Sequence, residues 1–254
     1  MINWEQKLEK FLATWEHMDD TIGILVCGSY ITGNPTSHSD LDVHIVLDGH
    51  AKYRERGNRI VDGLLIEYFA NPPNQIRAYF KEDYKDRSPS SQTQFITGKI
   101  ILDKTGEVQK LKEEAIEMLN KNYDDIPVKS SELTKYGLWD RLDDLQDAYE
   151  LNRADFDFLY FNCLDNLLSE YMRYIKRPYH MKTILGNITC ETVRNKYLLK
   201  ELPDDNISNL IFECITNPDK GVRIECYEKL TNIVLDMMGK FNVDGFKFKS
   251  DIDV

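Results

Sequence analysis

The sequence lacks the features of several special classes of protein. No apolar run approaches the roughly 18–20 residues that a membrane helix needs, and the first seven residues, MINWEQK, do not follow the basic-then-apolar plan of a signal peptide. The five cysteines are scattered and contain no C-x-x-C pair, so neither a disulfide framework nor a cysteine-based metal site is predicted. These absences predict a reduced, cytoplasmic protein with no membrane partner.

Basic residues are also in deficit. The chain has 32 Lys and Arg against 43 Asp and Glu, which gives a net charge of −11. The phosphates of nucleic acids attract basic surfaces, so a nucleic-acid partner is disfavoured, whereas a cationic small molecule is compatible with this charge. With 254 residues, 42% of them hydrophobic, the chain can build one large core or two modest ones.

The periodicity of apolar residues divides the chain into two halves. It predicts an α/β (α+β) N-terminal domain with a mixed sheet over residues 1–127, and an all-α helical bundle over residues 128–254. In the first half we expect a helix at 3–18, strands at 22–27, 41–47, 60–69 and 99–103, covering helices at 73–80 or 107–121, and a loop at 87–94. In the second half we expect helices at 135–151, 155–175, 191–201, 207–216 and 221–241.

One stretch, CGSYITGNPTSHSDLDVHIVLD at residues 27–48, carries residues that no strand needs. Because strand side chains alternate between faces, Asp40 and Asp42 share one face and the apolar residues between and after them share the other. Two carboxylates on one face favour a hard cation such as magnesium. Gly28 allows a ligand to approach the backbone, and the hydroxyl of Ser29 with nearby N–H groups can hold phosphate oxygens.

A third carboxylate is predicted on a neighbouring strand. In GLLIEYF, residues 63–69, Glu67 is an acid among apolar residues, and burying it without a partner would be costly. A shared cation beside Asp40 and Asp42 would neutralise it. We therefore predict Asp40, Asp42 and Glu67 as catalytic metal ligands, and Gly28, Ser29 and Ser39 as nucleotide-binding residues.

These motifs resemble the polymerase-β-like nucleotidyltransferase superfamily: a Gly-Ser step, a spacer of about ten residues, then Asp-x-Asp within a strand. The segments IVDGLLIEYFANP and TGKIILDKTGEVQKL look like the bacterial antibiotic (aminoglycoside and lincosamide) branch, which joins the catalytic domain to a helical bundle. The resemblance implies two magnesium ions and a nucleoside triphosphate as co-substrate. It also implies a role for Lys182, since family members often carry a lysine in this segment that reaches the nucleotide phosphates.

A narrow polar stripe interrupts the apolar helix expected at 155–175. Asn162, Asp165 and Asn166 belong to it, and it is either a solvated face or the wall of an acceptor site. On the preceding helix Asp144 lies nearest the apolar stripe, so it is the acid best placed to meet a cationic acceptor.

The sequence therefore predicts a magnesium-dependent nucleotidyltransferase that transfers AMP from ATP to a hydroxyl of a small, antibiotic-like acceptor and releases pyrophosphate. Two alternatives stay open: AMP transfer to a partner protein, as in nucleotidyltransferase antitoxins, and a non-catalytic nucleotide-binding module. No local motif encodes the acceptor, the nucleotide base or the oligomeric state.

Overall fold

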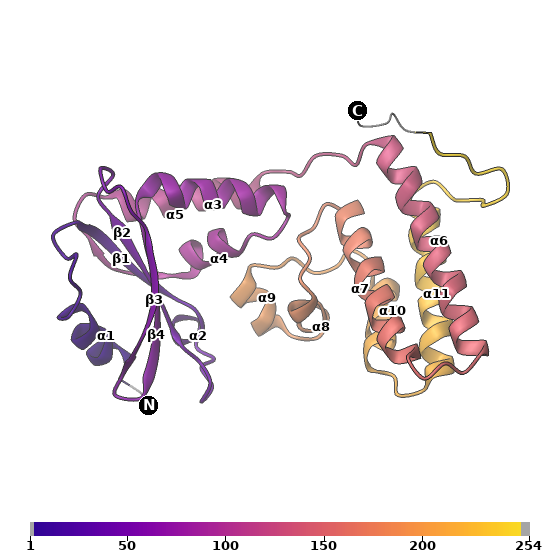
Figure 1. The fold of residues 1–254 in the computed structure, drawn as a ribbon, viewed down its shortest axis with the longest axis horizontal. Helices are drawn as coiled ribbons and strands as arrows, with labels where there is room; N and C mark the ends of the chain where they lie inside the picture. Colours follow the sequence, from indigo (N-terminus) through magenta and orange to yellow (C-terminus); the bar gives the residue numbers. More distant parts are fainter. Residues whose placement is uncertain (1–2, 250–254) are drawn as a thin grey trace. The chain divides into compact units, whose positions relative to one another are not determined.

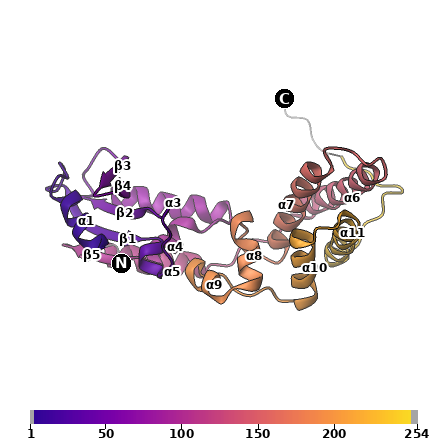
Figure 2. The same ribbon diagram turned by 90° about the horizontal axis from the view of Figure 1, so that it is seen from below.

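The computed structural model describes residues 3–249, and the chain forms two compact units, Met1–Lys121 and Asn122–Val254. The first unit is a mixed sheet with helices and the second is helical (Figures 1 and 2). None of the helices within residues 3–249 combines the length and the apolar character required to span a bilayer.

The first unit contains, in chain order, α1 (Trp4–Leu12), β1 (Thr21–Cys27), α2 (Ser29–Thr32), β2 (Leu41–Leu47), β3 (Glu55–Val61), β4 (Leu64–Asn71), α3 (Pro73–Lys85), α4 (Ser90–Thr97), β5 (Lys99–Asp103) and α5 (Glu107–Asn120). The strands form one sheet in the order β3-β4-β2-β1-β5. β2 and β4 are parallel and the other neighbours are antiparallel, so the mixed sheet predicted from the sequence is confirmed.

The two faces of this sheet have separate cores. On one face α1 packs through Leu8 and Phe11 against a cluster that includes Val43 and Ile66. On the other face α3, α4 and α5 cover the sheet, and Phe80 belongs to that second cluster; Figure 1 shows α1 on one side of the strands and α3 and α5 on the other. The face alternation predicted for residues 41–47 is confirmed, because Leu41, Val43 and Ile45 all lie in the α1 core.

The second unit contains α6 (Val128–Glu150), α7 (Phe156–Tyr174), α8 (Met181–Thr189), α9 (Glu191–Tyr197), α10 (Asp205–Thr216) and α11 (Lys220–Met237). Helices α6, α7, α10 and α11 pack around one core, in which the buried side chains include Tyr160, Tyr171 and Tyr227. The helical architecture expected after the sheet is therefore present.

The local structure differs from the expectations in four places. The helix expected at 3–18 ends at Leu12. The run 60–69 is not one strand: it contains the end of β3, the hairpin turn at Asp62-Gly63 and most of β4. Asp62 and Gly63 both adopt positive φ, 46° and 80°, and Asp-Gly favours such a tight turn. The loop expected at 87–94 contains the start of α4, whose N–H at Ser91 is capped by the carboxylate of Asp83 at 2.6 Å. Helix α8 was not expected at all, and it begins where the side chain of His180 accepts a hydrogen bond from the backbone N–H of Lys182.

Candidate active site

The strand register brings three carboxylates together on the sheet face opposite α1. The last residue of β1, Cys27, pairs with Asp42 of β2, and Asp42 pairs with Glu67 of the parallel strand β4. Asp40 precedes β2 by one residue. One ligand oxygen from each of Asp40, Asp42 and Glu67 lies within 4.8 Å of the others, and all three residues are half-buried. Oxygen ligands at this spacing suit a hard divalent cation.

A glycine lies against one side of this carboxylate cluster. Gly28 follows β1 with φ of 79°, a conformation that favours glycine, and it precedes the single turn of α2. A Cβ at this position would lie 2.3 Å from Oδ2 of Asp42, far closer than atoms can approach. Only glycine therefore allows the β1–α2 turn to lie directly against the Asp42 carboxylate. This close approach fits a site where a ligand bound to the metal also contacts the backbone of the turn.

Arginine and aromatic groups flank the cluster on the side of the β3–β4 hairpin. Arg56 of β3 forms an ion pair with Glu67 at 2.6 Å, and its guanidinium lies 4.8 Å from the ring centroid of Phe69. On β2 the ring of His44 stacks on Phe69 at 5.3 Å, and Nε2 of His44 donates to Oε1 of Gln94 at 3.2 Å. Arg56 was not among the predicted site residues. The Asp-Gly turn could have indicated its position, because this turn places β3 beside β4.

Burial controls the protonation of two neighbours of the cluster. The pKa of His44 is lowered to about 4 because desolvation disfavours the charged ring, and the hydrogen bond to Gln94 only partly opposes this. The pKa of the Cys27 thiol is raised well above its ordinary value, first by burial and then by the charges of Asp42 and Asp40. Both groups are therefore neutral near pH 7.

The other predicted nucleotide-binding residues have different surroundings. Ser29 begins α2 directly beside Gly28 and is half-buried. The hydroxyl of Ser39 accepts a hydrogen bond from the backbone N–H of Thr36 at 2.8 Å, so it stabilises the loop that leads into Asp40. Lys182 belongs to the second unit, in the first turn of α8, and its side chain is exposed.

The predicted acceptor residues lie on two helices of the second unit. Asp144 on α6 and Asn162 on α7 are exposed, whereas Asp165 and Asn166 on α7 are half-buried. The carboxylate of Asp165 accepts a hydrogen bond from the hydroxyl of Tyr179 at 2.5 Å. Burial and this carboxylate raise the pKa of Tyr179, so the tyrosine remains a donor and fixes the orientation of Asp165.

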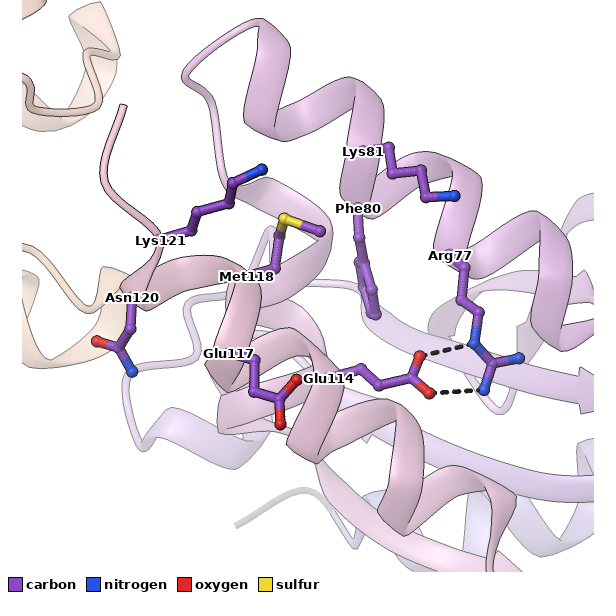
Figure 3. A pocket seen from close by; sticks show the side chains of 8 residues that line it. All are labelled: Arg77, Phe80, Lys81, Glu114, Glu117, Met118, Asn120 and Lys121. Carbon is purple, nitrogen blue, oxygen red and sulfur yellow. Dashed lines mark hydrogen bonds and ion pairs between the residues drawn. The ribbon is translucent and has the colours of Figure 1, made fainter. Parts of the chain in front are cut away.

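A separate hollow of about 560 Å³ lies in the first unit between α3 and α5 (Figure 3). Arg77 of α3 forms ion pairs there with Glu114 at 2.6 Å and with Glu107 at 2.7 Å, and these hydrogen bonds raise its pKa, the bond to Glu114 most. Figure 3 shows Arg77 and Glu114 facing each other across the two helices. The residues predicted for the active site do not line this hollow, and its ion pairs join α3 to α5.

The mixed sheet, with an acidic cluster beside a Gly-Ser turn, fits the class of nucleotidyltransferases. The family described as nucleotidyltransferase domain matches residues 7–135, half of the chain. The chain therefore belongs to this family, and the protein is a nucleotidyltransferase.

Among solved structures, the nucleotidyltransferase-like protein from Exiguobacterium sibiricum is similar to this chain, with 11% identity and a TM-score of 0.45, over 93% of this chain and 77% of that one. No curated protein matches the sequence.

Proposed function

We propose that the protein transfers a nucleoside monophosphate, AMP from ATP, to a hydroxyl of a small acceptor and releases pyrophosphate. The observation that carries this proposal is the convergence of Asp40, Asp42 and Glu67 within 4.8 Å of one another, immediately beside the Gly28 turn. Membership of the nucleotidyltransferase domain family supports it, because that chemistry needs a site for a divalent cation and a place for a triphosphate.

The carboxylate cluster fits magnesium, which prefers oxygen ligands. Asp40, Asp42 and Glu67 would hold two magnesium ions. Bound there, such ions supply charge stabilisation at the attacking and leaving oxygens of an in-line displacement. Gly28 and Ser29 would contribute backbone N–H groups and a hydroxyl to the triphosphate, and Lys182 a positive charge.

The chemical step forms one bond and breaks another. The acceptor hydroxyl oxygen attacks the α-phosphorus, the bond from that phosphorus to the oxygen bridging to the β-phosphate breaks, and pyrophosphate leaves with the electron pair. We assign to Glu67 the role of third metal ligand or of general base that receives the hydroxyl proton.

For the acceptor we propose an antibiotic-like small molecule that carries amino groups. The acids Asp144 and Asp165, with the amides of Asn162 and Asn166, would bind it. Two features support a cationic acceptor: the net charge of −11, and the hydrogen bond that holds Asp165 in one orientation. A positioned carboxylate offers a charged hydrogen bond to an ammonium group.

The test is a screen for pyrophosphate release with magnesium and each of the four ribonucleoside triphosphates in turn. The acceptors are aminoglycosides, lincosamides and bulk bacterial protein, and the control is the Asp42→Asn variant under identical conditions. Release that needs ATP, a small acceptor and Asp42 supports the proposal. Release only with bulk protein would instead indicate transfer to a protein partner, and nucleotide binding without release under any condition would indicate a binding module.

A further inference from the structure

The β3–β4 hairpin places a guanidinium on the carboxylate cluster. Arg56 donates from Nε and Nη2 to the same oxygen, Oε1 of Glu67, at 3.2 and 2.6 Å. The side chain of Arg56 is 70% exposed, whereas that of Glu67 is 21% exposed. The charge of a half-buried carboxylate is thus balanced by a group that solvent can reach.

Phe69 gives the same guanidinium a second contact. Arg56 and Phe69 are cross-strand partners, and the guanidinium carbon lies 4.8 Å from the ring centroid. A cation–π contact of this kind does not depend on Glu67. Arg56 can therefore lose its ion pair and still remain at the edge of the site.

The ion pair with Arg56 and a bound cation would both be stabilised by the same negative charge, that of Glu67. The oxygen that Arg56 contacts belongs to one of the three carboxylates whose ligand atoms converge within 4.8 Å. A divalent cation held by these carboxylates would stand beside the guanidinium, and positive charges at that separation repel each other.

We propose that Arg56 is the counter-ion of Glu67 in the metal-free chain and gives up this ion pair when a divalent cation binds to Asp40, Asp42 and Glu67. The inference rests on the proposed function, because it requires the carboxylate cluster to be the metal site. In the metal-free chain Arg56 offsets the repulsion among three neighbouring carboxylates, and it thereby keeps the site formed. The displaced guanidinium stays over Phe69.

The proposal makes the ion pair and metal binding thermodynamically opposed. Removal of the guanidinium should tighten the binding of a divalent cation, because no ion pair then has to be broken. Since Arg56 is largely exposed and its pair with Glu67 is screened by solvent, the expected gain in affinity is about two- to fivefold.

The experiment is a calorimetric titration of the full chain with Mn²⁺ alone. Arg56→Gln is compared with Arg59→Gln, a matched control that removes the same charge from the same strand. Arg59 pairs with Ile66, which belongs to the α1 core, so this arginine lies on the opposite face of the sheet. We expect Arg56→Gln to bind Mn²⁺ about two- to fivefold more tightly than Arg59→Gln.

A second background isolates the contact itself. In Glu67→Gln, which has no carboxylate at this position, the difference in Mn²⁺ affinity between the two arginine substitutions should become smaller, because no ion pair remains to be broken. Equal affinities of Arg56→Gln and Arg59→Gln in the otherwise native chain would overturn the inference, as would weaker binding by Arg56→Gln. If Asp42→Asn leaves Mn²⁺ binding unchanged, or if the native chain binds none, the metal site itself is wrong and the proposed function fails with it.

Discussion

Substitution of Gly28 by alanine tests whether the close approach of the β1–α2 turn to Asp42 matters for the site. The new Cβ would lie 2.3 Å from Oδ2 and 3.4 Å from Cγ of Asp42. The carboxylate must therefore rotate or the turn must move. Either change displaces one of the three carboxylates that converge on the proposed cation.

The magnitude has two separable parts. A residue with a Cβ at the φ of 79° and ψ of −162° of Gly28, a region that essentially only glycine adopts, costs about 1–3 kcal/mol of stability. Gly33→Ala is the control: Gly33 has φ of 92° in the left-handed region, where a Cβ costs about 1–2 kcal/mol, and a Cβ there meets nothing within 4 Å. Displacement of a metal ligand by its supporting residue typically costs about 10–100-fold in metal affinity, and this second loss should occur only in Gly28→Ala.

The assay measures Mn²⁺ affinity by calorimetry and stability by urea unfolding. A Trp139→Phe background leaves only Trp4 and Trp15 as tryptophans, so tryptophan fluorescence then reports the first unit alone. We expect Gly33→Ala to lose about 1–2 kcal/mol of unfolding free energy and Gly28→Ala about 1–3 kcal/mol, and only Gly28→Ala to lose metal affinity. Equal Mn²⁺ affinities in the two variants would refute the reasoning.

Three further predictions concern other residues of the two units. Glu67→Gln should lower turnover by about 10²–10⁴ while nucleotide affinity, measured by equilibrium dialysis, falls less; equal loss of both would contradict the role assigned to Glu67. Asp165→Ala should raise the acceptor KM without changing nucleotide affinity. Tyr179→Phe keeps the carboxylate and should raise the acceptor KM much less. Equal effects of the two substitutions would show that the charge of Asp165 is not what binds the acceptor. The pKa of His44 is lowered to about 4 in the folded chain from 6.5, so the unfolded state binds the extra proton first as the pH falls. The free energy of unfolding, measured in EDTA, should therefore fall by about 3 kcal/mol as the pH drops from about 6.5 to 4. A His44→Gln variant that shows the same fall would contradict this assignment.

The central features of the first unit could be predicted because they depend on local alternation. Residues on one strand share a face at every second position, so the pairing of Asp40 with Asp42 and the burial of Leu41 follow from the sequence alone. Glu67 could be predicted because a lone acid in an apolar strand needs a partner. Its direct register with Asp42, by contrast, depends on the parallel pairing of β2 and β4, which no local pattern encodes.

The surroundings of the cluster were predicted less well. The apolar run 60–69 suggested a single strand, although Asp62-Gly63 inside it forms the hairpin turn. Missing that turn meant missing β3, and with it the ion pair of Arg56. Helix α4 was not predicted because its start is rich in proline and serine. Its stability comes from the tertiary burial of Phe95 and from the hydrogen bond that Asp83 of α3 accepts, rather than from helix propensity.

The most direct test of the metal site is anomalous scattering from a crystal of the full chain grown with Mn²⁺ and a non-hydrolysable nucleoside triphosphate analogue. The account predicts an anomalous peak within bonding distance of carboxylate oxygens of Asp40, Asp42 and Glu67, beside the phosphates of the analogue. A crystal in which the analogue is bound and these three carboxylates hold no manganese would contradict it.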